Sequence, residues 1–365
     1  MCFGRGRFGR LGNGSEDNAA LPFPVPLPVG MIIKWVSAGG DHSMALSSEG
    51  QVLTWGFGGE GQLGLGDEEN RSVPTLVPDL EGVTAIGAGR SHSLAIKGGA
   101  VYTWGNGEHG CLGLGDTNRR LVPTRVPELQ GIVAVDGGYC FSVALSMDGV
   151  LHTWGQNGSG QLGVGDREDR NVPTRVDTLS HVVDVSAGGA HTLAVTSDGA
   201  IFSWGGGGSG RLGHGDDEAT VDVPRRIEHP ALEGVRIVRV GAGEDHSMAV
   251  SEEGRLYVWG KVGEGMLGLG DQIDEDGYLY VPTLVEGVEG VEGCEGGTYH
   301  SLLSTRGGAV MSFGECGNEG DDWGVNVNTG ENIPIDGRLG LGADVGRAVE
   351  ATAIADLTVE RRRRS

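Results

Sequence analysis

Pairs of histidine with serine or threonine are the residues of this sequence that most directly suggest chemistry. The pair recurs along the chain at His42, His92, His191, His246 and His300, and Phe141 takes the place of histidine in one further copy. Hydrolytic catalysis needs one histidine, one nucleophile and one orienting acid, brought together once. Five equivalent histidines therefore indicate a structural role, in which each ring hydrogen-bonds backbone beneath a turn.

Glycine motifs and acidic loops also imitate cofactor and metal sites. Gly56-x-Gly58-x-x-Gly61 matches the dinucleotide fingerprint, but that site requires a helix after the glycines, whereas another glycine turn follows here. The segment DQIDEDG from Asp271 lacks the ligand spacing and the terminal glutamate of an EF-hand loop. The five cysteines form no Cys-x-x-Cys pair, so no zinc site is indicated. We predict a non-enzymatic chain with no catalytic residue, no cofactor and no metal site.

The elements that carry these residues repeat about every fifty positions. An aromatic residue followed by glycine recurs at Phe3, Trp55, Trp104, Trp154, Trp204, Trp259 and Phe313. Most copies continue as in WGFGGEGQLGLGD, and we expect the closing aspartate to cap its turn by accepting from the amide two residues on. Short alternating runs between glycine turns indicate about four strands per copy. One such sheet cannot bury both faces, so the copies must pack face to face around an axis as a β-propeller.

The combined pattern, seen as SAGGDHSMAL from Ser37 and VPTRV from Val122, resembles the repeat of the regulator of chromosome condensation family over essentially the whole chain. The resemblance implies an all-β, seven-bladed β-propeller with about four strands per blade, at residues 1–359, followed by a basic tail at 360–365. The histidine half of the repeat occurs six times and the aromatic half seven times, so we expect the closing blade to lack one hairpin. Either the blade is incomplete or the sequence is shortened; we favour the second explanation because open sheet edges invite aggregation.

Charge and composition narrow the classes of partner. A formal net charge of -23 disfavours direct binding to nucleic acid or to an anionic membrane, because such binding relies on Lys and Arg. The acidity fits a protein partner with a basic surface, or it serves only solubility. The unpaired cysteines and the absence of a signal peptide or apolar span in the sequence favour a cytoplasmic or nuclear location. The run from Arg361 to Arg364 is either part of a nuclear-import signal or a solvated tail.

The resemblance places the binding residues at the two positions before each motif histidine, which line one face of the disc in that family. Those positions carry acidic residues in its Ran exchange factor and tryptophans in its plant UV-B photoreceptor. The resulting partner-binding candidates are Asp41, Arg90, Tyr139, Glu244, Asp245, Thr298 and Tyr299. None of these positions holds tryptophan, which argues against photoreception, while Asp41 and Asp245 match the Asp-His arrangement of the exchange factor. The alternative is that they are ordinary polar turn residues.

An insertion in the last copy adds one more candidate. Phe313 and Leu339 are 26 residues apart, whereas the matching residues Trp55 and Leu63 are 8 apart. The extra segment contains Trp323, which either anchors a partner or folds back onto its own blade.

We therefore predict a non-enzymatic protein-protein interaction scaffold that presents blade-end loops to a protein partner. The alternative function is guanine nucleotide exchange on a Ran-like small GTPase, which needs no catalytic nucleophile because exchange works by differential binding of the nucleotide-free state.

Overall fold

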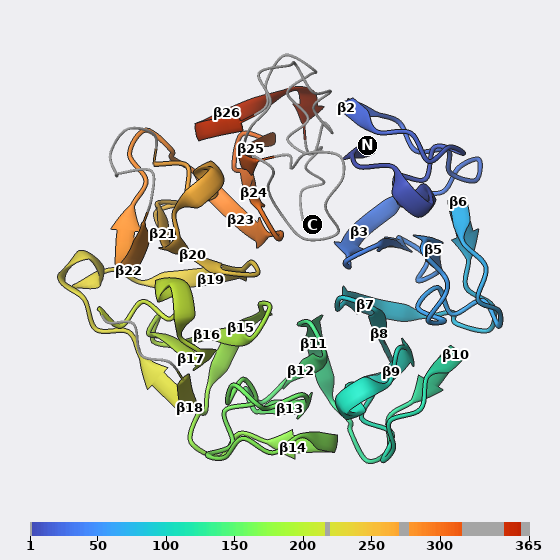
Figure 1. The fold of residues 1–365 in the computed structure, drawn as a ribbon, viewed down its shortest axis with the longest axis horizontal. Helices are drawn as coiled ribbons and strands as arrows, with labels where there is room; N and C mark the ends of the chain where they lie inside the picture. The colour runs from blue at the N-terminus through green and yellow to red at the C-terminus, as the bar shows by residue number, and fades with distance from the viewer. Residues whose placement is uncertain (1, 216–219, 270–276, 316–346, 359–365) are drawn as a thin grey trace.

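The computed structural model describes residues 2–215, 220–269, 277–315 and 347–358, and they form an all-β propeller (Figure 1). The sequence candidate Trp323, its insertion, and the basic residues from Arg361 to Arg364 lie outside the described residues. The described helices are single 3-10 turns, at η1 (Arg7–Gly9), η2 (Glu108–Gly110), η3 (Gly208–Gly210), η4 (Pro230–Leu232) and η5 (Gly263–Gly265). No helix in this part of the chain has the length and apolar character needed to cross a membrane.

Six four-stranded antiparallel sheets make up the blades. The first two contain β3 (Ile33–Ala38), β4 (His42–Ser47), β5 (Val52–Gly56) and β6 (Arg71–Leu76), then β7 (Val83–Ala88), β8 (His92–Lys97), β9 (Ala100–Gly105) and β10 (Arg120–Arg125). The third and fourth contain β11 (Ile132–Gly137), β12 (Phe141–Ser146), β13 (Leu151–Gly155) and β14 (Arg170–Arg175), then β15 (Val182–Ala187), β16 (His191–Thr196), β17 (Ile201–Gly206) and β18 (Thr220–Arg226). The fifth and sixth contain β19 (Ile237–Ala242), β20 (His246–Ser251), β21 (Leu256–Lys261) and β22 (Tyr278–Leu284), then β23 (Val291–Gly296), β24 (His300–Thr305), β25 (Ala309–Glu315) and β26 (Arg347–Thr358).

The expectation of seven blades is wrong. The described residues form six blades and a separate two-stranded sheet of β1 (Cys2–Gly4) and β2 (Ala19–Phe23). The aromatic-glycine count overestimated the number of blades because Phe3 and Gly4 belong to this short sheet, in which β2 is the one partner of β1 among the described strands. An aromatic-glycine motif in the sequence thus predicts a strand, but it does not predict that the strand belongs to a complete four-stranded sheet.

Each blade runs from its first strand near the axis to its fourth strand at the rim (Figure 1). Neighbouring first strands pack side by side in chain order from β3 to β23. Apolar side chains between successive blades form the core; one such cluster joins Met44 and Leu46 of the first blade to Ile86 and Trp104 of the second. The core therefore lies in layers between blades, as the face-to-face packing of a repeat requires.

A repeated set of hydrogen bonds joins each blade to the next. His42 Nε2 lies 2.9 Å from Ser93 Oγ, and that hydroxyl donates to the carbonyl of Gln62 over 2.8 Å. Trp104 Nε1 donates to the same carbonyl over 2.9 Å. Because Ser93 spends its proton on the carbonyl, the histidine must donate from Nε2, which leaves Nδ1 as the unprotonated ring nitrogen. The aromatic and histidine marks of the sequence are thus two parts of one inter-blade connection.

Glycine is required where this connection passes beneath the indole. Gly64 has φ +71°, and a Cβ atom built there would lie 2.7 Å from Trp104 Nε1. A side chain at this position would strain the left-handed backbone and also displace the ring. The Leu-Gly-x-Gly string is therefore set by packing against the next blade rather than by any phosphate or nucleotide.

Candidate functional site

The loops before the motif histidines come together around the axis at one face of the propeller, which we call the pre-histidine face. They connect the first and second strands of each blade. Backbone amides join one loop to the next: Gly40 donates to the Arg90 carbonyl over 3.0 Å, and Arg90 donates to the Gly138 carbonyl over 3.1 Å. Two further links run from Gly189 and Glu244 to the glycine carbonyls of the following blades. Side chains on this face are consequently held on a rigid base.

Four of the sequence candidates are close enough to interact on this face: Arg90, Tyr139, Glu244 and Tyr299. The Arg90 guanidinium stacks over the Tyr139 ring at 4.7 Å from its centroid. Burial raises the pKa of the Tyr139 hydroxyl well above its usual value, and the neighbouring Glu244 carboxylate raises it further. Tyr139 therefore stays protonated at neutral pH and remains a hydrogen-bond donor.

Gly189 explains how Tyr139 of the third blade comes near Glu244 of the fifth. Gly189 holds the corresponding position of the intervening fourth blade, where a Cβ atom would lie 3.2 Å from Glu244 Cγ. Its lack of a side chain leaves room for the contact above it. Glu244 Oε2 is buried and has no hydrogen-bond partner among the described residues. The Glu244 carboxylate also interacts with the Tyr139 hydroxyl through a side-chain hydrogen bond that contributes to the raised pKa of the tyrosine.

Asp41 and Asp245 are bound within the propeller. Asp41 accepts from Arg10 over 2.6 Å, and Asp245 accepts from Arg211, also over 2.6 Å. Each arginine lies in the Gly-x-Leu-Gly string of the preceding repeat unit and also donates to the backbone carbonyl just before its aspartate. The two carboxylates that match the exchange-factor pattern therefore have intramolecular partners.

The sequence contains a signal for these two ion pairs. It becomes visible when each repeat unit is compared with the unit that follows it. Arginine occupies the variable place of Gly-x-Leu-Gly at Arg10, Arg211 and Arg338, and the first two lie in the units before the two that carry aspartate next to histidine. The copies that have glutamine, cysteine or methionine at this place are not followed by aspartate next to histidine. Matched variation between facing positions is the sequence mark of a contact.

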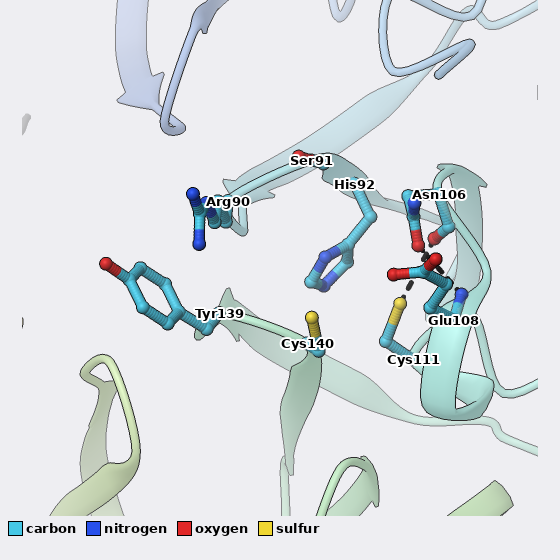
Figure 2. Close-up of a pocket in the computed structure, with 8 residues that line it drawn as sticks. All are labelled: Arg90, Ser91, His92, Asn106, Glu108, Cys111, Tyr139 and Cys140. Carbon is cyan, nitrogen blue, oxygen red and sulfur yellow. Dashed lines mark hydrogen bonds between the residues drawn. The ribbon is translucent and has the colours of Figure 1, made fainter. Parts of the chain in front are cut away.

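The same facing positions form a pocket between the second and third blades. Here the two places hold Cys111 and Cys140 instead of arginine and aspartate. The space has a volume of about 220 Å³ and is lined by Arg90, Ser91, His92, Asn106, Glu108, Cys111, Tyr139 and Cys140 (Figure 2). Cys111 Sγ donates to the Asn106 carbonyl over 3.1 Å, just as Arg211 Nε donates to the carbonyl of Gly206. The pocket thus lies where longer side chains form an ion pair elsewhere in the propeller.

The chemistry of the pocket is that of a polar recess rather than a reactive centre. Burial raises the pKa of both the Cys111 and Cys140 thiols, which keeps them protonated and poorly nucleophilic. Figure 2 shows Arg90 and Tyr139 on one side of the recess and Glu108 with Cys111 on the other. No cluster of His, Cys, Asp and Glu suited to a metal occurs in the described parts of the chain. The recess offers a cation, a carboxylate and amide groups to an incoming side chain.

The remaining candidates lie nearby or outside the described part. The Lys261 ammonium lies 5.6 Å from the Tyr299 ring centroid, while Thr298 is exposed on the same loop. Trp323 cannot be placed. Sequence reasoning missed Lys261 and Glu108 as neighbours of this face, because elements that are far apart in the chain bring them there.

The motif histidines are scaffold. Burial lowers the pKa of His246 to about 3 and that of His92 to about 4. His246 Nε2 lies 2.8 Å from the Ser301 hydroxyl, so the histidine ring bonds a side chain of the next blade. The sequence analysis had instead predicted a hydrogen bond to backbone beneath a turn. The aspartates at turn ends do cap backbone amides: Asp67 accepts from Glu69 N over 3.0 Å and also binds Arg71.

A second acidic group lies on the inner strands. Asp136, Asp184 and Glu295 come from the third, fourth and sixth blades. Burial raises the pKa of Asp136 to about 6, although the amides of Ala187 and Gly137 and the Ser186 hydroxyl oppose the rise. The Glu295 side chain is exposed, and crowding by neighbouring protein atoms together with the Asp136 and Asp184 charges raises the pKa of its carboxyl.

Comparison with known proteins identifies the family. A model described as the RCC1-like domain matches residues 1–233, and the Regulator of chromosome condensation (RCC1) repeat matches residues 237–264 and 253–304. The chain belongs to the RCC1-like domain family. This RCC1-like propeller is 38% identical over 96 residues to the Ultraviolet-B receptor UVR8 of Arabidopsis thaliana, a match covering 26% of this chain and 22% of the receptor. It is 39% identical over 95 residues to the human E3 ubiquitin-protein ligase HERC2, covering 26% of this chain and 2% of the ligase.

Solved structures agree with the fold. Yeast RCC1 (Prp20), in a structure with Kap60 bound, is similar with a TM-score of 0.82 and 25% identity, covering 97% of this chain and 83% of the other. Prp20p from Saccharomyces cerevisiae, studied together with its binding to Gsp1p and histones, gives a TM-score of 0.81 at 25% identity, over 97% of this chain and 85% of that one. The matches to curated relatives span about a fifth or less of those proteins, so their activities do not transfer with the matched segment.

Proposed function

We propose that this propeller is a non-enzymatic protein-binding scaffold whose partner docks on the pre-histidine face, at the pocket between the second and third blades. The observation that carries the proposal is the pocket itself. An arginine-aspartate ion pair closes the same position between the fourth and fifth blades, and another does so between the β1–β2 segment and the first blade, whereas Cys111 and Cys140 leave it open. Arg90, Tyr139 and the buried oxygen of Glu244 then supply the polar contacts.

The chemistry of the face indicates what kind of partner fits. Aromatic and arginine side chains on a rigid base are typical of the energetically important centre of protein interfaces. The Glu244 carboxylate lies beside Tyr139 on this face, and Glu108 adds a second carboxylate at the recess. With the net charge of -23, these features favour a partner that inserts a lysine, arginine or amide group from a basic surface.

The test fills the pocket with the arginine-aspartate pair that the chain uses at another blade interface. The double substitution Cys111→Arg with Cys140→Asp introduces the ion pair that the fifth blade forms with Arg211 and Asp245. A matched control, Val122→Arg with Val172→Asp, makes the same charge change at exposed positions on the outer strands β10 and β14. Quantitative affinity capture from an extract of the source organism should lose its partner with the first variant and keep it with the second. Equal capture by both variants would refute the pocket as the docking site.

Nucleotide exchange on a Ran-like GTPase is the second candidate function. It is supported by the similarity to Prp20p, whose binding to Gsp1p and histones has been studied, and by the Asp-His pairs at Asp41 and Asp245. An exchange factor would stabilise the nucleotide-free GTPase more than the nucleotide-bound form. Release of a fluorescent guanine nucleotide should then accelerate on addition of the propeller and slow again with Asp245→Asn. Binding of the GTPase without faster release would support the scaffold alone.

A further inference from the structure

The ion pair between the fourth and fifth blades shows how this propeller binds a guanidinium group. Arg211 Nε donates to the Gly206 carbonyl over 2.8 Å. Arg211 Nη1 donates to the Glu244 carbonyl over 3.0 Å and to Asp245 Oδ1 over 2.6 Å. Arg10 makes the three corresponding contacts in the segment before the first blade. We call this set of two backbone carbonyls and one carboxylate the guanidinium cradle, and the chain uses it twice for its own arginines.

The pocket between the second and third blades keeps the first carbonyl of the guanidinium cradle. The Asn106 carbonyl accepts from the Cys111 thiol over 3.1 Å, and the two residues are five positions apart, as in the contact of Arg211 Nε. A carbonyl oxygen has two lone pairs, so a guanidinium N–H group can bond it beside the thiol. Because the guanidinium is charged, its bond would be stronger than the weak bond of the thiol. The pocket thus retains an acceptor that its own short side chain uses only weakly.

The second carbonyl of the cradle is also kept, at Tyr139, which stands at the place of Glu244. In both loops the glycine before this residue donates to the carbonyl of the motif position three residues on, over 2.9 Å. The carbonyl of the next residue accepts an amide at the end of the third strand, over 2.8 Å for Cys140 and 2.9 Å for Asp245. These matching hydrogen bonds give the Tyr139 carbonyl the orientation of its counterpart, toward the pocket that Tyr139 lines.

Two glycines beside Arg211 show where a carboxylate of the pocket lies. A Cβ atom at Gly206 would lie 3.3 Å from Arg211 Nη2, and one at Gly208 would lie 3.6 Å from it. The pocket has Asn106 and Glu108 at these two positions, so their side chains begin beside the place of a guanidinium amino group. Burial raises the pKa of both pocket thiols, and the Glu108 charge adds to the rise, as its closeness in Figure 2 requires. Glu108 can therefore supply the negative charge that the cradle has in its aspartate.

Arg90 is the cation that an incoming arginine would meet at the pocket. Its guanidinium stacks over the Tyr139 ring, on the side of the pocket away from Glu108 and Cys111 (Figure 2). This charge opposes a second cation and attracts a carboxylate. The groups around the place of the guanidinium are, however, two carbonyls and a carboxylate, all of them acceptors that repel an anion. The geometry of the cradle therefore favours a cationic donor over a carboxylate.

We propose that the pocket binds an arginine side chain of the partner protein in the manner of the guanidinium cradle. The proposal names the group that enters the docking pocket, and it rests on the docking function proposed above. The planar guanidinium presents its N–H donors in a fixed fork that suits two carbonyls and a carboxylate. The ammonium of lysine is compact and strongly hydrated, and an amide has fewer donors and brings an acceptor of its own.

The probe is N-acetyl-arginine amide, compared with the matching amides of lysine, glutamine and glutamate. Ligand-observed NMR with the full chain measures each dissociation constant, and a ligand of this size should bind in the millimolar range. We expect the arginine amide to bind about fivefold more tightly than the lysine and glutamine amides. Equal binding of the arginine and lysine amides would overturn the guanidinium assignment. Tighter binding of the glutamate amide would show that Arg90 dominates the pocket and would also overturn it.

Matched variants change the cradle in opposite directions. Cys140→Asp adds the carboxylate that the cradle has at Asp245, and it should tighten arginine binding about tenfold through a charge-assisted hydrogen bond. Glu108→Gln removes the pocket carboxylate and should weaken binding about threefold, because this side chain is exposed. Val122→Asp adds the same charge at an exposed place on β10 and should change the affinity by less than about twofold. Cys140 is only half-buried, so both pocket variants should fold. An affinity that neither pocket variant changes would refute the proposal.

Further outcomes separate this proposal from the docking function on which it rests. If the Cys111→Arg and Cys140→Asp double substitution abolishes partner capture while the arginine amide does not bind the parent protein, the docking site stands and the arginine is refuted. If the amide binds as expected while capture survives the double substitution, the guanidinium site stands and the docking function is refuted. Binding of the amide that appears only after removal of residues 360–365 would assign the pocket to an arginine of this chain and overturn the partner as its source.

Discussion

Replacing a motif histidine by phenylalanine should remove a pH-dependent loss of stability while leaving the propeller folded. His246 is completely buried and lies 2.8 Å from the Ser301 hydroxyl. The third blade already has phenylalanine at the corresponding place. Phe141 is buried and pairs with Gly155, just as His246 pairs with Gly260. His246→Phe therefore repeats a substitution that the fold accepts in another blade.

The magnitude follows from the pKa of the buried ring. Burial lowers the pKa of His246 from 6.5 to about 3, so the unfolded chain binds a proton that the folded chain excludes. Stability is complete above the unfolded pKa and falls as the pH drops toward the folded one. Between pH 7.5 and 5.5, one such histidine lowers the free energy of unfolding by about 1.4 kcal/mol. The lost hydrogen bond to Ser301 costs the variant about 1 kcal/mol at every pH.

Because of these two effects, the free energies of unfolding of the parent and the variant should converge as the pH falls. At pH 7.5 the His246→Phe protein should be about 1 kcal/mol less stable than the parent protein, and at pH 5.5 the two should be nearly equal. Urea unfolding followed by tryptophan fluorescence at pH 5.5, 6.5 and 7.5 measures the difference. His181→Asn is the control, because this exposed residue has φ +58°, which asparagine tolerates. If the parent and His246→Phe lose the same free energy between pH 7.5 and 5.5, the histidine is not held neutral and the scaffold interpretation fails.

Three further changes test other parts of the structure. Gly64→Ala should destabilise the fold by about 3 kcal/mol, because it adds an overlap with the next indole to left-handed strain, while Gly115→Ala, with φ +86° and no neighbour within 4 Å, should cost only about 1 kcal/mol in urea unfolding. Arg211→Ala should cost about 2 kcal/mol, since it leaves its partly buried carboxylate unpaired, whereas Arg175→Ala breaks an exposed pair and should change the melting midpoint little. Asp136→Asn should act in the opposite sense to the histidines: its carboxyl has a raised pKa of about 6, so the parent protein loses about 1 kcal/mol through this group as pH rises from 5 to 8, and the variant does not.

The repeat predicted the strands well and the closure of the ring poorly. Alternation within each copy and the glycine turns between runs were enough to predict four strands per unit, because both depend on local backbone chemistry. The number of blades was wrong because a single aromatic-glycine pair at Phe3 and Gly4 was counted as a complete unit. Whether a strand finds two partners or one depends on segments far away in the chain, and a local mark carries no information about them.

The candidate site shows the same division between local and distant information. The family resemblance predicted that the positions before the histidines share a binding face, and in the structure Arg90, Tyr139, Glu244 and Tyr299 lie close enough to interact. It did not follow from one copy that Asp41 and Asp245 would be held by arginines of the preceding unit. That contact joins two copies, so only a comparison between neighbouring copies can reveal it.

Comparing neighbouring copies also explains why the pocket lies where it does. The facing positions hold an arginine and an aspartate twice, and a cysteine pair once. The ion pairs fix their side chains close to the blade backbone, while two short thiols with raised pKa values neither attract each other nor extend across the gap. The backbone is linked in the same way at the Arg211–Asp245 pair and at the pocket, where Gly189 donates to the Gly243 carbonyl and Arg90 donates to the Gly138 carbonyl. A recess can therefore form at one interface of a repeat protein where two facing side chains are short, while the backbone connections between the blades are kept.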